Sequence, residues 1–314
     1  MADINGKLGA KSATYGWYAQ ITGNGFDGQQ FLAIKDDIVA SGAVFVASVM
    51  PYIDFSAVTP DVASQVAAVM KQFTDAGVTV WLRYAHEMNY YVTDGTYKGD
   101  AGAFVESWKN IYNAACKDND KVACFWSPNQ AGNPASDLAS WWPGEEFVDL
   151  VGIDCYPTKD DDTSSGALFD KLYGGFYDAF SKPYGLPFAI GETGANAEKK
   201  EAWLKTLVGQ KEKYPNYVSM SWFEYDKEAD FRIVETDEGT LGQTKETLLA
   251  GGNDQCSAPA TGNETAPAPA PSESASVPAD GGQAGQCDWG CWGWDCSKDE
   301  DCRDPWACQS GYCK

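Results

Sequence analysis

The sequence predicts an α/β protein whose main domain is a (β/α)8 TIM barrel, followed by a linker and a small disulfide-rich module. Short apolar runs alternate with helical patterns along residues 1–256, and repeated strand–helix units imply a parallel sheet. A domain of this length has the size of a single barrel. No Gly-rich phosphate loop follows any of the apolar runs, so a closed barrel is favoured over a doubly wound open sheet.

Seven short apolar runs are predicted to form strands of this barrel. An eighth strand is expected to be short and hidden near residues 4–10 or 31–34, unless the N-terminal part is remodelled. The seven predicted strands are residues 14–18, 44–49, 78–84, 121–127, 150–155, 187–190 and 217–223.

Helical patterns fall between these runs. Apolar side chains recur on one helix face in residues 61–75, 101–116 and 197–212. The side chains expected to face the sheet are Val62, Val66, Val69, Met70 and Phe73 in the first helix, Phe104, Trp108, Ile111, Tyr112 and Ala115 in the second, and Trp203, Leu204 and Leu207 in the third.

The chain changes character after residue 256. Residues 257–286 contain many Pro, Ala and Ser residues and lack large apolar side chains, so they are predicted to be a disordered, semi-stiff linker. The linker holds one N-glycosylation sequon, Asn263-Glu-Thr265, which suggests a glycoprotein. Residues 287–314 carry six of the ten cysteines, and so short a module needs disulfides as its core.

Cysteine usage predicts a secreted, extracellular protein. An even number of closely spaced cysteines indicates disulfides formed in an oxidising compartment. Cys116 and Cys124 flank a helix-to-strand turn and are expected to pair, which leaves Cys155 and Cys256 as a second pair by elimination. The first five residues do not form a signal peptide, so we expect that a leader has been removed.

The charge balance excludes several partners. A formal net charge of −22 repels nucleic acids and anionic lipid surfaces, although it could serve solubility alone. No apolar run is long enough to span a membrane, and we expect a monomer. His86 is the only histidine, which excludes metal sites built from several histidines.

Polar residues directly follow three of the predicted strands, at the end where barrel enzymes place their chemistry. These residues are Arg83, His86, Glu87 and Asn89 after the third run, Asp154 and Tyr156 after the fifth, and Glu192, between two glycines, after the sixth.

Two glutamates on separate strand ends of one barrel suit the hydrolysis of a glycosidic bond. One carboxyl group protonates the leaving oxygen, and the other attacks the anomeric carbon or activates water. A single strand-end carboxylate could instead cap a helix or join a salt bridge. The hypothesis therefore depends on Glu87 and Glu192 together.

The motifs around these glutamates resemble glycoside hydrolase family 26. Arg83-Tyr-Ala-His-Glu-Met-Asn89 is similar to the acid/base signature of that family, and Ala189-Ile-Gly-Glu-Thr-Gly194 stands where the family keeps its nucleophile. Phe125-Trp-Ser-Pro-Asn129 and the segment 141–157 are similar to the strand ends between them. The resemblance runs from about Val78 to Ile233, is weak over the first 75 residues and is absent from the tail.

The resemblance implies a retaining reaction with Glu87 as general acid/base and Glu192 as nucleophile, and carboxyl groups roughly 5–5.5 Å apart. It places these residues after the fourth and seventh strands of the barrel. It implies a polysaccharide partner and no metal or organic cofactor. The residues expected to bind substrate or to assist the glutamates are Arg83, His86, Asn89, Trp126, Asp154, Tyr156 and Trp222, with Trp222 as the sugar platform at the scissile subsite, Trp126 as a neighbouring platform and Tyr156 holding the nucleophile ionised.

Two of these residues have a structural alternative. Arg83 could form a salt bridge inside the barrel top, and His86 could be a hydrogen-bonded core histidine. The two glutamates need opposite environments. Burial or the charge of Glu192 should raise the pKa of Glu87, and donors should keep Glu192 ionised.

The leading hypothesis is a secreted retaining endo-β-glycanase that acts on a cell-wall polysaccharide, with β-1,4-mannan as the first choice. The alternatives are a β-1,3-glycanase or a wall-remodelling transglycosylase that uses the same glutamates, and a non-catalytic polysaccharide-binding protein. The presence of both glutamates disfavours the binding protein. Tyr90 stands where the family has glycine, so the subsite beside the acid/base, and with it the polysaccharide, is open.

The tail carries more aromatic side chains than a minimal module can bury. Exposed tryptophans can stack on sugar rings, so we expect a carbohydrate-binding module, with an appendage for stability or protein contact as the alternative. Zinc is disfavoured, because the tail has no histidine and no paired Cys-x-x-Cys spacing, and its six cysteines allow 15 pairings. The expected sugar-binding residues are Trp289, Trp292, Trp294 and Trp306.

Overall fold

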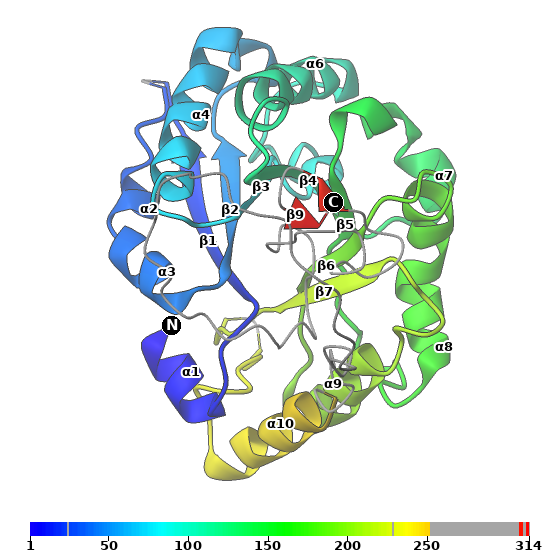
Figure 1. Ribbon diagram of the computed structural model, residues 1–314. Helices are drawn as coiled ribbons and strands as arrows, with labels where there is room; N and C mark the ends of the chain where they lie inside the picture. The colour runs from blue at the N-terminus through cyan, green and yellow to red at the C-terminus, as the bar shows by residue number, and fades with distance from the viewer. Residues whose placement is uncertain (24, 228, 252–307, 310–311, 314) are drawn as a thin grey trace, which may run out of the picture.

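The structure, a computed structural model, describes residues 1–23, 25–227, 229–251, 308–309 and 312–313. Its main sheet has seven parallel strands in the order of the sequence, and helices surround the sheet (Figure 1). The strands are β1 (Thr14–Ile21), β2 (Val44–Pro51), β3 (Val80–Tyr84), β4 (Val122–Trp126), β5 (Leu150–Ile153), β6 (Phe188–Thr193) and β7 (Tyr217–Trp222).

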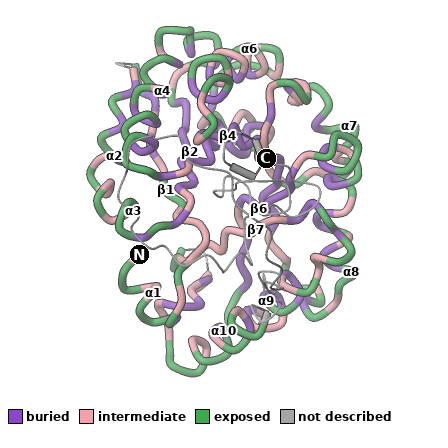
Figure 2. The backbone as a smooth tube through the Cα atoms, in the orientation of Figure 1, coloured by how far each residue is buried: buried purple, intermediate pink, exposed green. Residues whose placement is uncertain are grey.

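All seven predicted strands are confirmed, each within three residues of its expected bounds. Most of their residues are buried, as Figure 2 shows for the central strands. Val46, Trp81 and Phe125 belong to a cluster formed by strand residues alone, so this cluster fills the inner side of the curled sheet. The opposite face of the strands packs against the helices in the larger core. Burial on both faces explains why these strands are nearly continuous apolar runs.

The expected eighth strand is absent from both predicted positions. Residues 2–8 form helix α1 (Ala2–Leu8), which ends at Gly9 with a φ of 76°, a left-handed conformation that glycine adopts without a steric penalty. Residues 29–32 form the short helix α2 (Gln29–Leu32). The described sheet therefore has seven strands, and Glu87 and Glu192 belong to the third and sixth instead of the fourth and seventh.

The edge strands β1 and β7 do not pair in the described part of the chain, and helix α1 packs beside β7. Leu8 at the end of α1 packs with Leu204, Ile233 and Val234, and this cluster also contacts β7. Lys7 Nζ lies 2.5 Å from Glu235 Oε2 in a partly exposed ion pair. The N-terminal helix thus packs beside β7 and is formed by residues where an eighth strand was expected.

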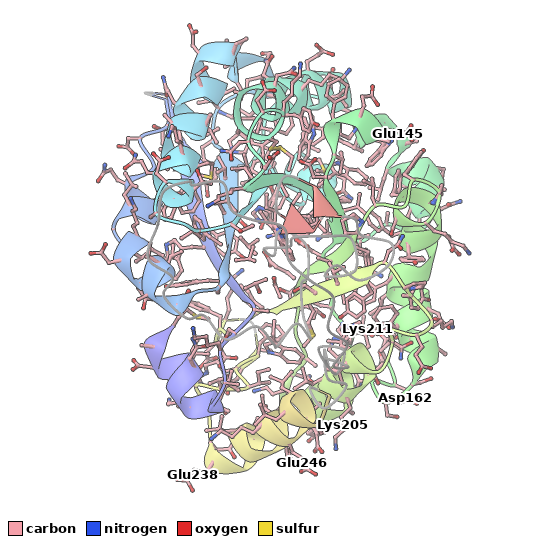
Figure 3. All side chains as sticks on the ribbon, viewed as in Figure 1. Glu145, Asp162, Lys205, Lys211, Glu238 and Glu246 are labelled. Carbon is pink, nitrogen blue, oxygen red and sulfur yellow. A yellow bond between two sulfur atoms is a disulfide. The ribbon has the colours of Figure 1, made fainter. Side chains whose placement is uncertain are left out.

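The three predicted helices are confirmed. Residues 101–116 form a helix whose last turn, Tyr112–Cys116, is π-helical, and 197–212 contains a shorter helix than expected. Polar side chains at the rim of the helical layer, among them Glu145, Lys205 and Glu246, point away from the sheet (Figure 3). Besides α1 and α2, the described α-helices are α3 (Lys35–Ser41), α4 (Pro60–Thr74), α5 (Met88–Tyr91), α6 (Ala101–Ile111), α7 (Pro134–Asp137), α8 (Gly166–Phe169), α9 (Lys200–Val208) and α10 (Glu238–Gly251), of which α4, α6 and α9 are the three predicted ones.

The predicted disulfide between Cys116 and Cys124 is confirmed and links the end of the π-helical turn to β4. Cys155 is buried and forms no disulfide with any described cysteine, while Cys256 lies outside the described residues. Among the described helices, none is both long and apolar enough to cross a membrane.

The predicted linker and most of the tail lie outside the described residues, as do Trp289, Trp292, Trp294 and Trp306. Two short strands of the tail, β8 (Cys308–Gln309) and β9 (Tyr312–Cys313), pair in an antiparallel way. The domain boundaries and the sugar-binding role of the tail stay predictions.

Candidate active site

The polar residues singled out at the strand ends gather at the carboxyl edge of the sheet. Arg83 lies on β3, Asp154 directly follows β5, and Glu192 lies on β6. Glu87 follows β3 in a tight turn in which Ala85 and Glu87 adopt φ angles of 47° and 53°. Such left-handed conformations cost energy for residues other than glycine and occur often at functional sites. The turn directs the Glu87 carboxyl group toward the end of β4, where it meets Asn129.

Glu192 is held by donors from three parts of the sheet. Its Oε1 accepts hydrogen bonds from Tyr18 Oη at 2.6 Å and from Arg83 Nη1 at 2.8 Å. Its Oε2 accepts a longer bond of 3.2 Å from Tyr156 Oη. The predicted role of Tyr156 beside the nucleophile thus has a direct contact in the structure.

Arg83 forms the salt bridge that was one of its two predicted roles. Its side chain is buried, and its two terminal nitrogens bind different carboxylates, Glu192 and Asp154. Asp154 also accepts a hydrogen bond of 2.8 Å from Ser127 Oγ. A buried charge of this kind is tolerated because it is paired and hydrogen-bonded.

Gly191 makes this network sterically possible. A Cβ atom at this position would lie 2.3 Å from both Asp154 Oδ1 and Ser127 Oγ. The absence of a side chain at Gly191 therefore allows Asp154 and Ser127 to lie close to the backbone beside Glu192.

The pKa of Glu192 is lowered. Burial alone raises it, but the positive charge of Arg83 and the hydrogen bonds from Arg83 and Tyr18 outweigh the burial. Asp154 differs, because burial raises the pKa of its carboxyl group and Arg83 only opposes that rise. The lowered pKa keeps Glu192 ionised at the site.

The pKa of Glu87 is raised. Burial is the main cause and the negative charge of Glu192 is the second, while a 2.7 Å hydrogen bond from Asn129 Nδ2 opposes them. Asn89 exchanges two hydrogen bonds with the backbone of Asn129, and its predicted substrate contact stays a prediction. Asn89 thus orients the residue that orients Glu87.

His86 is neutral in this environment. Burial and the nearby Arg83 charge lower the pKa of its imidazole to about 3. Its Nε2 lies 3.9 Å from Glu192 Oε1, and its Nδ1 has no hydrogen-bond partner among the described residues. The imidazole lies between the rings of Tyr18 and Tyr91, at centroid distances of 5.5 and 5.6 Å.

The two predicted tryptophan platforms are placed differently. Trp126 is fully buried and packs against Trp142, Phe176 and Phe180, so its ring has no face free for a sugar and belongs to the core. Trp222 ends β7 and is partly buried, and its indole donates a hydrogen bond of 2.7 Å to the Phe231 carbonyl. Its sugar contact stays a prediction.

Three residues at the site were not predicted from the sequence. Tyr18 binds Glu192, while Asn129 and Tyr91 hydrogen-bond Glu87. Asn129 is the last residue of the motif 125–129, and Tyr91 lies two residues after the motif that ends at Asn89. Both could therefore have been proposed as site residues from their place in or beside a motif. Tyr18 ended a predicted strand but belonged to no motif.

One described group has the spacing of a metal site, formed by Cys116, Cys124 and Asp149. Its two sulfur atoms are joined in the disulfide, so they offer no thiolates to a metal ion. The carboxylates at the strand ends are engaged by Arg83 and by tyrosine and asparagine donors.

The fold has counterparts among solved structures, and the three described here are distant in sequence. A family 26 β-mannanase from Bacteroides ovatus is 17% identical, with a TM-score of 0.58 over 79% of this chain and 81% of its own. The catalytic domain of an endo-β-1,4-mannanase from a Bacillus species is 16% identical, with a TM-score of 0.58 over 79% and 78%. A β-mannanase from a symbiotic protist of the termite Reticulitermes speratus, complexed with gluco-manno-oligosaccharide, is 17% identical, with a TM-score of 0.52 over 78% and 79%.

No curated protein matches the sequence significantly. The family model of glycosyl hydrolase family 26 matches residues 46–234, more than half of the chain. The matched range contains Glu87, Glu192 and the residues that bind them, except Tyr18. The chain is a glycoside hydrolase and belongs to glycosyl hydrolase family 26.

Proposed function

We propose that the protein is a secreted, monomeric, retaining endo-β-glycanase that hydrolyses β-1,4-mannan. The observation that carries the proposal is the contrast between two carboxyl groups in one site. Glu192 accepts hydrogen bonds from Tyr18, Arg83 and Tyr156, and its pKa is lowered, whereas burial and the charge of Glu192 raise the pKa of Glu87. A retaining glycosidase needs one protonated carboxylic acid and one ionised carboxylate at the same pH. A network kept only for stability gives no reason for a protonated glutamate beside an ionised one.

The reaction follows from these two states. In the first step Glu192 bonds to the anomeric carbon, the glycosidic bond breaks, and the proton of Glu87 passes to the leaving oxygen. Esterification removes the charge of Glu192, which lowers the pKa of Glu87 and prepares it as a base. In the second step Glu87 takes a proton from water, the water oxygen bonds to the anomeric carbon, and the bond to Glu192 breaks.

Variants of the two glutamates test this mechanism. Glu192→Ala should abolish turnover of polysaccharide. Glu87→Ala should be nearly inactive on polysaccharide but should keep activity on aryl glycosides, whose leaving groups need no proton. Wild-type activity in both variants would refute the assignment, and thermal melts of each variant would show that the fold is retained.

The choice of mannan is supported by the similar structures, which include a β-mannanase and an endo-β-1,4-mannanase. A reducing-sugar assay over mannan, mixed-linkage glucan, β-1,3-glucan, β-1,3-xylan and galactan tests it. Preference for any other polymer would overturn the substrate. NMR of the first products would show retention or inversion, and transfer products would indicate a transglycosylase.

Secretion is supported by the disulfide between Cys116 and Cys124, since such bonds persist in oxidising compartments. Recovery of the protein from the culture medium of its source cells, with this bond intact by mass spectrometry, would be the expected result. The proposed sugar-binding role of the tail is tested by polysaccharide pull-down with the full chain and with residues 1–256.

A further inference from the structure

The two carboxylate oxygens of Glu192 have unequal surroundings. Oε1 accepts two short hydrogen bonds, 2.6 Å from Tyr18 and 2.8 Å from Arg83. Oε2 accepts one hydrogen bond, 3.2 Å from Tyr156, among the described residues. Hydrogen bonds to an ionised oxygen are strong when they are short, so the electron pairs of Oε1 are held far more firmly than those of Oε2.

Tyr18 supplies the shortest of these bonds from an unexpected part of the chain. It lies on the edge strand β1, 174 residues from Glu192 in sequence, and precedes the range 46–234 that matches the family. Burial and the charge of Glu192 raise the pKa of its phenol well above the ordinary value. The hydroxyl group therefore stays protonated and acts only as a donor toward Glu192.

We infer that Tyr18 is a positioning residue that holds Oε1 of Glu192, and that Oε2 is the oxygen that attacks the anomeric carbon. This inference rests on the proposed retaining mechanism. Tyr18 and Arg83 fix one oxygen from two different strands, so the carboxylate cannot rotate to exchange its oxygens without losing both bonds. When the sugar approaches Oε2, only the longer hydrogen bond from Tyr156 has to break.

The same contacts assist the second step. In the glycosyl-enzyme, Oε2 carries the sugar and Oε1 is the carbonyl oxygen of the ester. When water attacks and the bond between Oε2 and the anomeric carbon breaks, the electron pair of that bond returns to the carboxylate. Tyr18 and Arg83 already donate to Oε1, where half of this charge develops, and such preorganised donors lower the barrier.

The pH dependence follows from every group that faces Glu192. Loss of the Tyr18 donor raises the pKa of Glu192, so the acidic limb of the kcat/KM profile should move to higher pH. Arg83 continues to oppose protonation in the variant. The charged and titratable groups around Glu192 come from five parts of the fold. They are Arg83 and His86 from β3 and the turn after it, Glu87 from the same turn, Tyr91 from α5, Asp154 and Tyr156 from the end of β5, and Tyr18 from β1.

Tyr18→Phe tests the inference, with Tyr15→Phe as the matched control. Tyr15 lies on the same strand, and its hydroxyl donates a hydrogen bond of 2.9 Å to Asp37 away from the site. We expect Tyr18→Phe to lower kcat by about 10–100-fold, as loss of a hydrogen bond to a charged group does. The acidic limb should rise by about one pH unit, and a dinitrophenyl β-mannobioside should show a burst of product because the second step has slowed. Tyr15→Phe should match the wild type in all three measurements.

An identical acidic limb and no burst in Tyr18→Phe would overturn the inference. A second experiment uses the wild-type enzyme and does not depend on how the variant folds. A crystal structure of the enzyme trapped with 2-deoxy-2-fluoro-β-mannobiosyl fluoride should show the sugar on Oε2 and Tyr18 still bonded to Oε1. A bond through Oε1 would refute the inference alone, whereas activity in Glu192→Ala would refute the proposed mechanism itself.

Discussion

Replacing Gly191 by alanine should break the network that holds Glu192. The added Cβ would lie 2.3 Å from Asp154 Oδ1 and 2.3 Å from Ser127 Oγ, while carbon and oxygen atoms in contact stand about 3.3 Å apart. Both partners must move by roughly 1 Å. Asp154 is buried between Arg83 and the Gly191 backbone, so its displacement separates a buried ion pair.

The expected loss can be worked from the buried pair. Separating such a pair costs about 3–5 kcal/mol, and a domain of this size loses roughly 2–4 °C of Tm for each kcal/mol. We therefore expect Tm to fall by roughly 6–20 °C. Arg83 also binds Glu192, so kcat should fall by about 100-fold or more even below the transition.

Circular dichroism melts and a reducing-sugar assay at a temperature where the variant is folded measure both effects. Gly242→Ala is the control, because no described atom lies within 4 Å of its added Cβ. Gly242 lies within α10, where alanine should raise stability by about 0.5–1 kcal/mol. A Gly191→Ala enzyme with wild-type Tm and kcat would refute the steric reasoning.

Two further predictions concern residues around the site. Asn129→Ala removes a hydrogen bond that lowers the pKa of Glu87, so the alkaline limb of the kcat/KM profile should move to higher pH, and a downward shift would contradict the assignment of Glu87 as the acid. Trp126→Ala empties a fully buried site and should cost about 3–5 kcal/mol of stability with KM unchanged at temperatures where the variant is folded. A raised KM with an unchanged Tm would instead restore Trp126 as a sugar platform.

The strands could be predicted from sequence because each one is a compact apolar run, and all seven formed. The face of each side chain could not, since a strand buried on both sides has no alternation of apolar and polar residues. Phe125 faces the inner cluster, and Trp126 faces the helices. Whether Trp126 belongs to the core or forms a sugar platform depended on the face of β4 from which its side chain projects.

Irregular pairing hides the orientation of Trp222 in a similar way. The register between β6 and β7 shifts twice, once between Ile190 and Thr193, and a shift of one residue turns every later side chain to the other face. No residue pattern in 217–223 signals such a shift. The prediction of an eighth strand was wrong for another reason. Residues 2–8, which include most of one expected position, form a helix that ends at Gly9 in a left-handed conformation.

The site itself was predictable where the motif was local. Glu87 and Glu192 stand in short signatures at strand ends, and the structure brings both together with Arg83. Tyr18 was not predictable, because its contact joins the first and sixth strands and depends on the curl of the whole sheet. Long-range contacts of this kind leave no trace in a single sequence.

Substitutions around Arg83 and substitutions around Asn129 should affect the two limbs of the pH profile differently. The guanidinium group of Arg83 contacts Ser48 on β2, Asp154 after β5 and Glu192 on β6. A substitution at any of these positions therefore changes contacts on several strands, so its effect will depend strongly on the residues at the other positions. Asn129, which contacts Glu87, is only partly buried and lies in a loop. Directed evolution of this enzyme should therefore shift its alkaline limit with single mutations at Asn129, while changes at Ser48 or Asp154 should be useful for its acidic limit only when they are combined with changes on the other strands that Arg83 contacts.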